Sequence, residues 1–195
     1  MREAVAATAK LGGGQWGVTF PDTGLGQQLR QAAALIKAGG NFGMERQVFL
    51  VGLGGFGASA NLAALYRELS PAMSAFLSAT REMGMAQSVT TYTDTEFSRT
   101  LRPNTRGGAD PAWGGHHLVM GGGVIGGSVH GMFPLPSAGD PHDAKQRGIL
   151  RPSSTKEQFH STLANWFGVS YSDVMRLLPG IRTGGRPTLG FMVTG

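Results

Sequence analysis

The chain contains no cysteine among its 195 residues. This absence excludes a disulfide framework, a cysteine-based zinc site and a thiol nucleophile. Charged residues are also scarce, at 15% of the chain. No hydrophobic run approaches the roughly 18–20 residues that a membrane-spanning helix needs, so we expect no membrane span.

Glycine is abundant instead, with 32 residues, and 41% of the chain is hydrophobic. That is enough hydrophobic material to bury a core. Lys and Arg number 17 against 12 Asp and Glu, which gives a formal net charge of +5. The basic residues are scattered, with no run of five and no alternation with aromatic residues. We therefore expect no nucleic-acid partner.

The first ten residues carry no recognisable export signal. They lack the roughly 7–15-residue apolar core of a signal peptide, and they contain no twin-arginine pair. No repeat and no long linker divides the rest of the chain. We predict a single domain over residues 1–195, in which residues 1–19 form a flexible leader.

Hydrophobic periodicity predicts alternating helices and strands in the first half. Residues 23–40 have the three-and-four spacing of a helix. The apolar run at 47–51 predicts a strand buried on both faces, as in a parallel sheet. Residues 61–69 predict a second helix, which bends or restarts at Pro71 before the strand predicted at 88–93. This order favours an α/β fold with a layered helix–sheet–helix arrangement and a mostly parallel short sheet.

The second half is less regular. Residues 94–123 read mostly as loop, and 124–133 suggest a short strand or hairpin. The pattern Ser154–Glu157 predicts a capping box that opens a helix. A last short helix is expected at 173–178.

A literal G-x-G-x-x-G motif runs from Gly52 to Gly57 after the predicted strand. In dinucleotide-binding folds such glycines let the backbone approach a pyrophosphate at a helix N-terminus. The acidic residue expected about 20 positions later is missing, and Asp94 is too distant in the sequence. Dinucleotide binding through this motif is one hypothesis, and a plain glycine loop at a strand end is the other.

Two polar segments carry the remaining candidate chemistry. Asp94, Glu96 and Arg99 follow the second predicted strand, where open α/β sheets place their ligands. Arg99 could hold a phosphate or sulfate, or pair with Glu96.

Asp110 precedes the adjacent pair His116 and His117, and imidazole is a common metal ligand. Neighbouring side chains in a strand point to opposite faces, so at most one of the two would reach a common ion. The other histidines are expected at the surface or in hydrogen bonds: His130, His142 and His160.

Several motifs fall in order with matching spacing over residues 47–61, 89–101, 109–122 and 154–168. Together they resemble the carboxyl-terminal portion of a bacterial family catalogued as domain of unknown function fifteen-oh-one. That family is similar to the alkaline phosphatase and sulfatase superfamily. The resemblance implies a partial alkaline-phosphatase-like α/β sandwich, truncated relative to the family, with metal ligands at strand ends. It also implies an exported or periplasmic family that uses the twin-arginine route.

The chain departs from the family pattern at three positions that the resemblance implies to be metal ligands. Gly57, Ser59 and Pro111 stand where the family has Asp, His and His. Glycine and proline offer no side-chain donor atom, and the serine hydroxyl is a poor neutral ligand. We therefore expect a degenerate, catalytically inactive binding or assembly module.

The retained family residues form a candidate residual site: Glu96, Arg99, Asp110, His116 and His117. The alternative function is a metal-dependent phosphate or sulfate ester hydrolase. It would hold zinc or manganese with Glu96, Asp110 and a histidine, and Arg99 would bind the substrate.

The amino-terminal part of the family, with the rest of its sheet, has no counterpart in this chain. An incomplete sheet has an open edge, and such edges are usually covered or paired. We therefore expect a homodimer, or a chain that forms part of a longer product.

Overall fold

A computed structural model describes residues 16–40, 43–57, 61–133, 143, 148–183 and 186–193. The chain divides into two compact units, Met1–Val89 and Thr90–Gly195, which are described separately. The leader predicted at 1–19 falls mostly on residues outside the described part of the chain.

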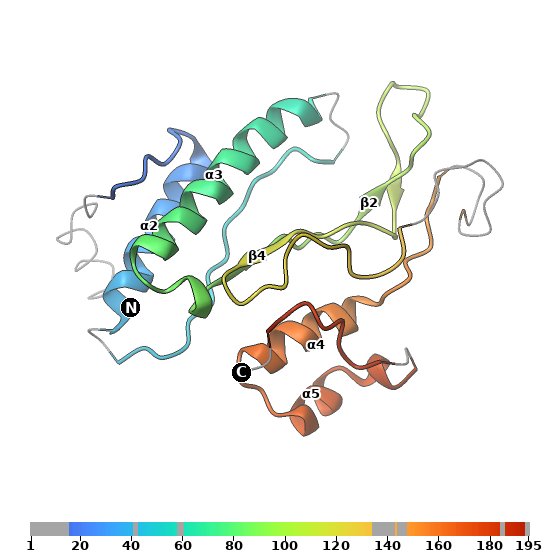
Figure 1. Ribbon diagram of the computed structural model, residues 1–195. Helices are drawn as coiled ribbons and strands as arrows, with labels where there is room; N and C mark the ends of the chain where they lie inside the picture. Colours follow the sequence, from blue (N-terminus) through green and yellow to red (C-terminus); the bar gives the residue numbers. More distant parts are fainter. Residues whose placement is uncertain are drawn as a thin grey trace. The chain divides into compact units, whose positions relative to one another are not determined.

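Two helices form the core of the first unit, α2 (Gly24–Gly39) and α3 (Leu62–Glu82) (Figure 1). The Thr23 side chain caps α2 by accepting a hydrogen bond from the backbone N–H of Gly26 at 3.1 Å. Small and branched residues let the helices approach closely, and the buried cluster is Leu25, Leu29, Ala32, Ala33, Ile36, Ala72, Phe76 and Ala79. The helix predicted at 23–40 is confirmed.

Helix α3 runs without interruption through Pro71, so no fresh start occurs there. Proline removes one backbone donor from the helical ladder. The fully buried residues of α3 all follow this proline: Ala72, Met73, Ala75, Phe76, Ala79 and Thr80. The second half of the helix therefore carries most of its packing.

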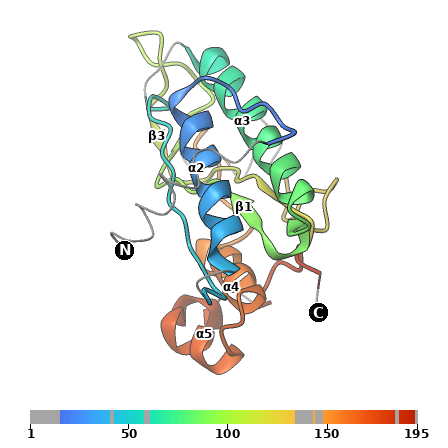
Figure 2. The ribbon, with the colours of Figure 1, turned by 90° about the vertical axis from the view of Figure 1, so that its left-hand side faces the viewer.

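The strand predicted at 47–51 is wrong, because these residues form no strand ladder with the described residues. The segment is extended and runs along the helix pair (Figures 1 and 2). Phe49 and Val51 pack against the α2–α3 cluster, whereas Val48 is 79% and Leu50 99% exposed. The continuous apolar run is thus buried on one face only.

The described strands of the second unit form two small antiparallel sheets. Strand β1 (Thr90–Tyr92) pairs with β4 (Val119–Gly121), and β2 (Ser98–Arg99) pairs with β3 (Pro111–Ala112). The protein is of mixed α/β type, as predicted.

The predicted mostly parallel sheet is wrong for the described residues, which also give no support to an alkaline-phosphatase-like sandwich. A parallel pair requires a crossover, usually a helix. Here β1 and β4 are joined by a segment that itself folds back as the β2–β3 hairpin.

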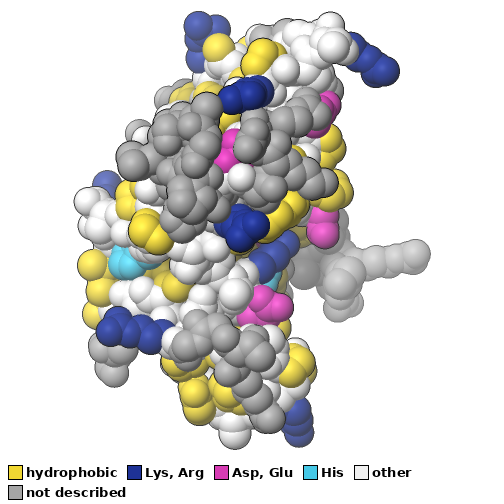
Figure 3. All heavy atoms as spheres, turned by 90° about the vertical axis from the view of Figure 1, so that its right-hand side faces the viewer, with side chains coloured by type: hydrophobic (Ala, Val, Ile, Leu, Met, Phe, Trp, Pro, Cys, Tyr) yellow, Lys and Arg dark blue, Asp and Glu magenta, His cyan; other side chains and the backbone are white. Residues whose placement is uncertain are grey.

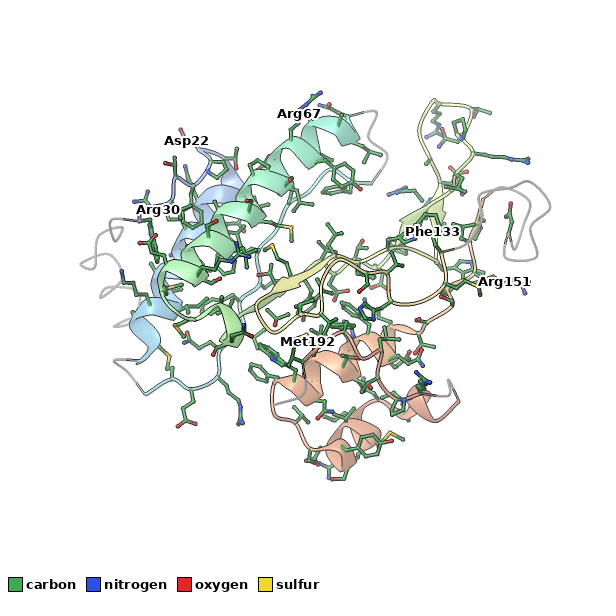
Figure 4. All side chains as sticks on the ribbon, viewed as in Figure 1. Asp22, Arg30, Arg67, Phe133, Arg151 and Met192 are labelled. Atoms are coloured by element: carbon green, nitrogen blue, oxygen red, sulfur yellow. The ribbon has the colours of Figure 1, made fainter. Side chains whose placement is uncertain are left out.

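Helices α4 (Lys156–Trp166) and α5 (Tyr171–Leu177) complete the second unit. The capping box of α4 is made by Thr155 and Gln158, one residue after the predicted one. Phe159 and Leu163 of α4 pack against Phe191 and Met192, the latter labelled in Figure 4.

Three smaller features complete the secondary structure. The chain near Val124 contributes a single antiparallel bridge to Met192 and not the hairpin suggested at 124–133. Short 3₁₀ turns occur at η2 (Ala86–Ser88) and η3 (Pro179–Thr183). In the part of the chain that is described, no helix is long and apolar enough to cross a bilayer.

Candidate functional site

A group of titratable side chains surrounds Asp94, two residues after β1. The Nζ atom of Lys156 lies 3.0 Å from Oδ1 of Asp94, and Nε2 of His160 lies 3.6 Å from Oδ2. Lys156 and His160 are four residues apart on α4 and therefore share one helix face. Both carboxylate oxygens of Asp94 thus face a basic group on the same helix.

His117 completes this group, which we call the Asp94 cluster: Asp94, His117, Lys156 and His160. The Nδ1 atom of His117 lies 2.8 Å from the backbone oxygen of Thr93, and its ring stacks on Phe159 with 5.3 Å between centroids. Thr93 also accepts, through its side-chain oxygen, a hydrogen bond from the backbone N–H of Leu118. These contacts continue the β1–β4 pairing, so the sheet positions His117 beside α4.

Burial and the neighbouring charges both shift the pKa values of Asp94 and His160. Partial burial alone would raise the pKa of Asp94, but the hydrogen bond and positive charge of Lys156, aided by the two histidines, lower that pKa below its usual value. Burial lowers the pKa of His160, and the repulsion from Lys156 and His117 adds to it, while Asp94 opposes the change. An ionised Asp94 carboxylate and a neutral His160 are therefore the favoured states near neutral pH.

A second group of predicted site residues lies on the β2–β3 hairpin and consists of Arg99, Asp110 and Pro111. Arg99 and Pro111 are register partners, and Nη1 of Arg99 donates to the backbone oxygen of Ala109 at 3.1 Å. Oδ1 of Asp110 accepts from the side-chain amide of Asn104 at 3.0 Å. Oδ1 of Asn104 in turn accepts from the backbone N–H groups of Arg106 and Gly108. These polar side chains hold the hairpin loop in place.

The other predicted site residues do not join these groups. Glu96 is exposed and makes no ion pair with the described residues. The ring of His116 packs against Phe133, with 5.0 Å between centroids. Gly57 belongs to the first unit, and Ser59 and His142 lie outside the described residues. The structure thus places Arg99 and Asp110 on the same β2–β3 hairpin, and His117 in a different group.

Sequence reasoning missed the partners of Asp94. His160 was expected at the surface or in a hydrogen bond, without a named partner, and its Nε2 atom lies 3.6 Å from the carboxylate of Asp94. The spacing of Lys156 and His160 on a predicted helix was a usable signal that both face one side. Nothing in the sequence indicated that this side would meet the end of β1.

The described residues contain no group of three or more His, Asp or Glu side chains arranged to hold a metal ion. Pro111 offers no donor, and Asp110 is engaged with Asn104. The residues present therefore do not fit the ligand set that the resemblance implies. On the face shown in Figure 3, Lys and Arg side chains are spread singly and do not gather into one patch.

The Gly52–Gly57 loop follows an extended segment and not a paired strand. Gly55 has φ of 99°, a conformation that favours glycine, and a side chain there would press on Leu65. Local geometry is therefore a sufficient reason for glycine at this position.

These observations define a mixed α/β protein whose polar groups are largely engaged with one another. The family described as Protein of unknown function (DUF1501) matches residues 55–181, and the chain belongs to this family. The match covers the region from the glycine loop to η3, including both polar groups. Comparison with curated proteins gave no match, and comparison with solved structures gave none either.

Proposed function

We propose that this chain is a catalytically inactive binding or assembly module derived from a phosphate or sulfate ester hydrolase. The alkaline phosphatase and sulfatase resemblance, and the export of the family, are part of this proposal. The module would use the frame of such a domain without its metal-dependent chemistry. The first support is chemical: Gly57 and Pro111 have no side-chain atom that can bind a cation.

The single observation that carries the proposal is the closed state of the Asp94 cluster. A carboxylate that serves as a metal ligand must present at least one oxygen to the ion. Both oxygens of Asp94 face basic side chains of the protein itself, Nζ of Lys156 at 3.0 Å and Nε2 of His160 at 3.6 Å. His117, the retained histidine of this group, is engaged with Thr93 and Phe159. These residues join β1 to α4, and their polar atoms are engaged with one another.

Calorimetric titration of the chain with zinc and with manganese tests the proposal. We expect no binding at micromolar concentrations and no hydrolysis of p-nitrophenyl phosphate or p-nitrophenyl sulfate. The metal-dependent hydrolase, the rival function, requires saturable binding of one ion together with turnover of one of these esters. Either result would overturn the inactive assignment.

A revertant variant provides the matched control. The triple change Gly57→Asp, Ser59→His and Pro111→His restores the donor atoms that the family pattern has. If this variant binds zinc or manganese and the natural chain does not, the three positions are correctly assigned as former ligands. If the folded variant also fails to bind, the assignment of these positions is wrong.

A further inference from the structure

The extended segment between α2 and the glycine loop has one face that no described residue covers. From Gln47 to Gly54 the side chains alternate strictly between partly buried and exposed positions. Phe49, Val51 and Leu53 pack on the helix cluster, while Val48 and Leu50 point away from it at 79% and 99% exposure. This period of two is that of a β-strand. We call residues 45–54 the open segment.

The backbone of the open segment is almost free of hydrogen bonds. Residues 45–51 make none with any described residue. Gly52 is the exception: its N–H donates to Oε1 of Gln28 at 2.9 Å, and its carbonyl oxygen accepts from Nε2 of Gln28 at 3.0 Å. Gln28 thus occupies part of one edge of the segment in the way a neighbouring strand would.

The contact with Gln28 identifies which edge is open. In a strand, the N–H and C=O of one residue point to the same edge, and successive residues alternate between the two edges. Gly52 and the other even-numbered residues therefore face the edge that Gln28 touches. Residues 47, 49, 51 and 53 present their backbone groups to the opposite edge. Residues 47–54 contain no proline and no charged residue, although exposed strand edges usually carry such protection.

We propose that the open segment pairs with the same segment of a second copy of this chain, antiparallel and centred on Phe49. This inference rests on the proposed assembly function and names its partner and its surface. Phe49 would face its own counterpart as a hydrogen-bonded pair through the open edge. Gln47 would pair with Val51 of the other copy, and the two-fold axis would repeat each contact.

The side chains of the segment are self-complementary in this register. Val48 of each copy lies opposite Leu50 of the other, so the two most exposed apolar residues cover one another on the outer face. These are non-hydrogen-bonded pairs, in which opposite side chains are closest. Shifting the centre to Val48 would place Leu50 opposite Arg46, and shifting it to Leu50 would place Val48 opposite Gly52. The register centred on Phe49 is the one that covers both apolar residues with apolar residues.

The charges agree with this arrangement. Glu45 and Arg46 are the charged residues of the segment, and both lie at its beginning. In the proposed antiparallel pair they face Leu53 and Gly52, so no like charges meet. A parallel pair in register would place Glu45 beside Glu45 and Arg46 beside Arg46, which is destabilising. Charge therefore favours the antiparallel orientation.

Light scattering after size-exclusion chromatography of the full chain tests the interface. We expect a concentration-dependent dimer that Leu50→Lys weakens roughly tenfold or more, because the symmetry removes two apolar cross-strand pairs at once. Leu177→Lys is the matched control, since Leu177 is also exposed, at 67%, but lies on α5. A monomer at every concentration, or equal weakening by both variants, would overturn the proposal.

Disulfide trapping tests the register, because the natural chain has no cysteine. Chains carrying Val48→Cys and chains carrying Leu50→Cys are oxidised separately and after mixing. In the proposed register, positions 48 and 50 of different copies are opposite, whereas two copies of position 48 are about 7–8 Å apart on the diagonal. Such a separation is too long for a disulfide without backbone movement. We expect cross-linked dimer mainly in the mixture, and equal cross-linking in the separate samples would contradict the register.

The outcomes of this experiment and of the metal titration are distinct. Metal binding by a chain that still dimerises through the open segment would refute the inactive function and leave the interface standing. A monomer that binds no metal would refute the interface and leave the inactive function standing.

Discussion

At the scale of single residues, Asp94 connects two elements of the second unit. Its carboxylate joins the end of β1 to two positions on α4. The side chains of Asp94 and Lys156 are 44% and 45% exposed, so solvent screens their attraction. Such pairs contribute on the order of 0–1 kcal/mol to the free energy of unfolding. The cluster therefore adds little to stability, and its importance is that it joins the end of β1 to α4.

Close backbone approach makes Gly114 a sensitive position to test in the second unit. A Cβ atom added there would overlap the carbonyl oxygen of Leu150, which is backbone and cannot rotate away. We expect Gly114→Ala to lower the free energy of unfolding by about 1–3 kcal/mol, as overpacking commonly does. Chemical denaturation followed by circular dichroism measures this change.

Gly126 provides the control for that substitution. It is exposed, and an added Cβ would meet nothing within 4 Å. Gly126→Ala should therefore leave the free energy of unfolding nearly unchanged. Equal losses of unfolding free energy in the two variants would mean that the close approach of Gly114 to Leu150 is not the cause of the loss in Gly114→Ala.

At the scale of elements, the start of α4 offers a test between two neighbouring hydroxyl groups. The Thr155 side chain accepts a hydrogen bond from the backbone N–H of Gln158 at 3.1 Å, and the Gln158 side chain returns one to Thr155 at 2.9 Å. We expect Thr155→Ala to cost about 1 kcal/mol of unfolding free energy, since a capping oxygen is lost. Thermal and urea denaturation measure the loss.

Ser154→Ala is the natural comparison, because the sequence pattern predicted the cap at Ser154. The structure places the N-cap at Thr155, so the Ser154 variant should unfold like the natural chain. A larger loss from Ser154→Ala than from Thr155→Ala would show that the helix begins one residue earlier in solution.

Helices were predictable from the sequence because their signals are local. The three-and-four spacing of Leu25, Leu29 and Ile36 predicted α2, and polar and capping residues predicted α4 within two residues. The run 47–51 led to a wrong prediction of a strand buried on both faces, because a short apolar run does not show whether one face or both faces are covered. Strand pairing depends on distant partners, so the antiparallel order of β1 and β4 had no local signal.

For the candidate site too, the sequence predicted local features but not the contacts between distant residues. Residue type and spacing singled out Asp94, Arg99, Asp110 and His117 as chemically notable. The contact of Asp94 with Lys156 and His160 required the fold, because about 60 residues separate the two sides. Local patterns name candidate residues, and the chain topology decides which of them meet.

At the scale of the whole molecule, the Asp94 cluster makes stability depend on pH. The pKa of His160 is lowered from 6.5 in the fold, so the unfolded chain binds a proton there more readily. The contribution of neutral His160 to the free energy of unfolding is complete above pH 6.5 and is lost as the pH falls through the lower folded pKa. The lowered pKa of Asp94 adds a second loss below its ordinary value of 3.8. We expect the free energy of unfolding to decrease in acid in these two stages.

Urea denaturation at a series of pH values measures this dependence. His160→Gln should remove the first stage, worth at most about 1 kcal/mol because the side chain is partly exposed and screened. His116→Gln, which changes a histidine outside the cluster, should retain that stage. If both variants keep the same pH dependence as the natural chain, His160 does not carry the acid sensitivity.

Pro71 divides the uninterrupted helix α3 into two parts that differ in how deeply their side chains are buried. Its first part, up to Ser70, has no fully buried residue, although Glu68 accepts a hydrogen bond from the backbone N–H of Leu25 at 3.2 Å, whereas the buried contacts with α2 come from the part after Pro71. A missing ladder bond at the junction allows the first part to fray without breaking the second. We therefore expect the part of α3 before Pro71 to open locally at a lower free energy than the part after it, so the helix has one less stable end and one more stable end.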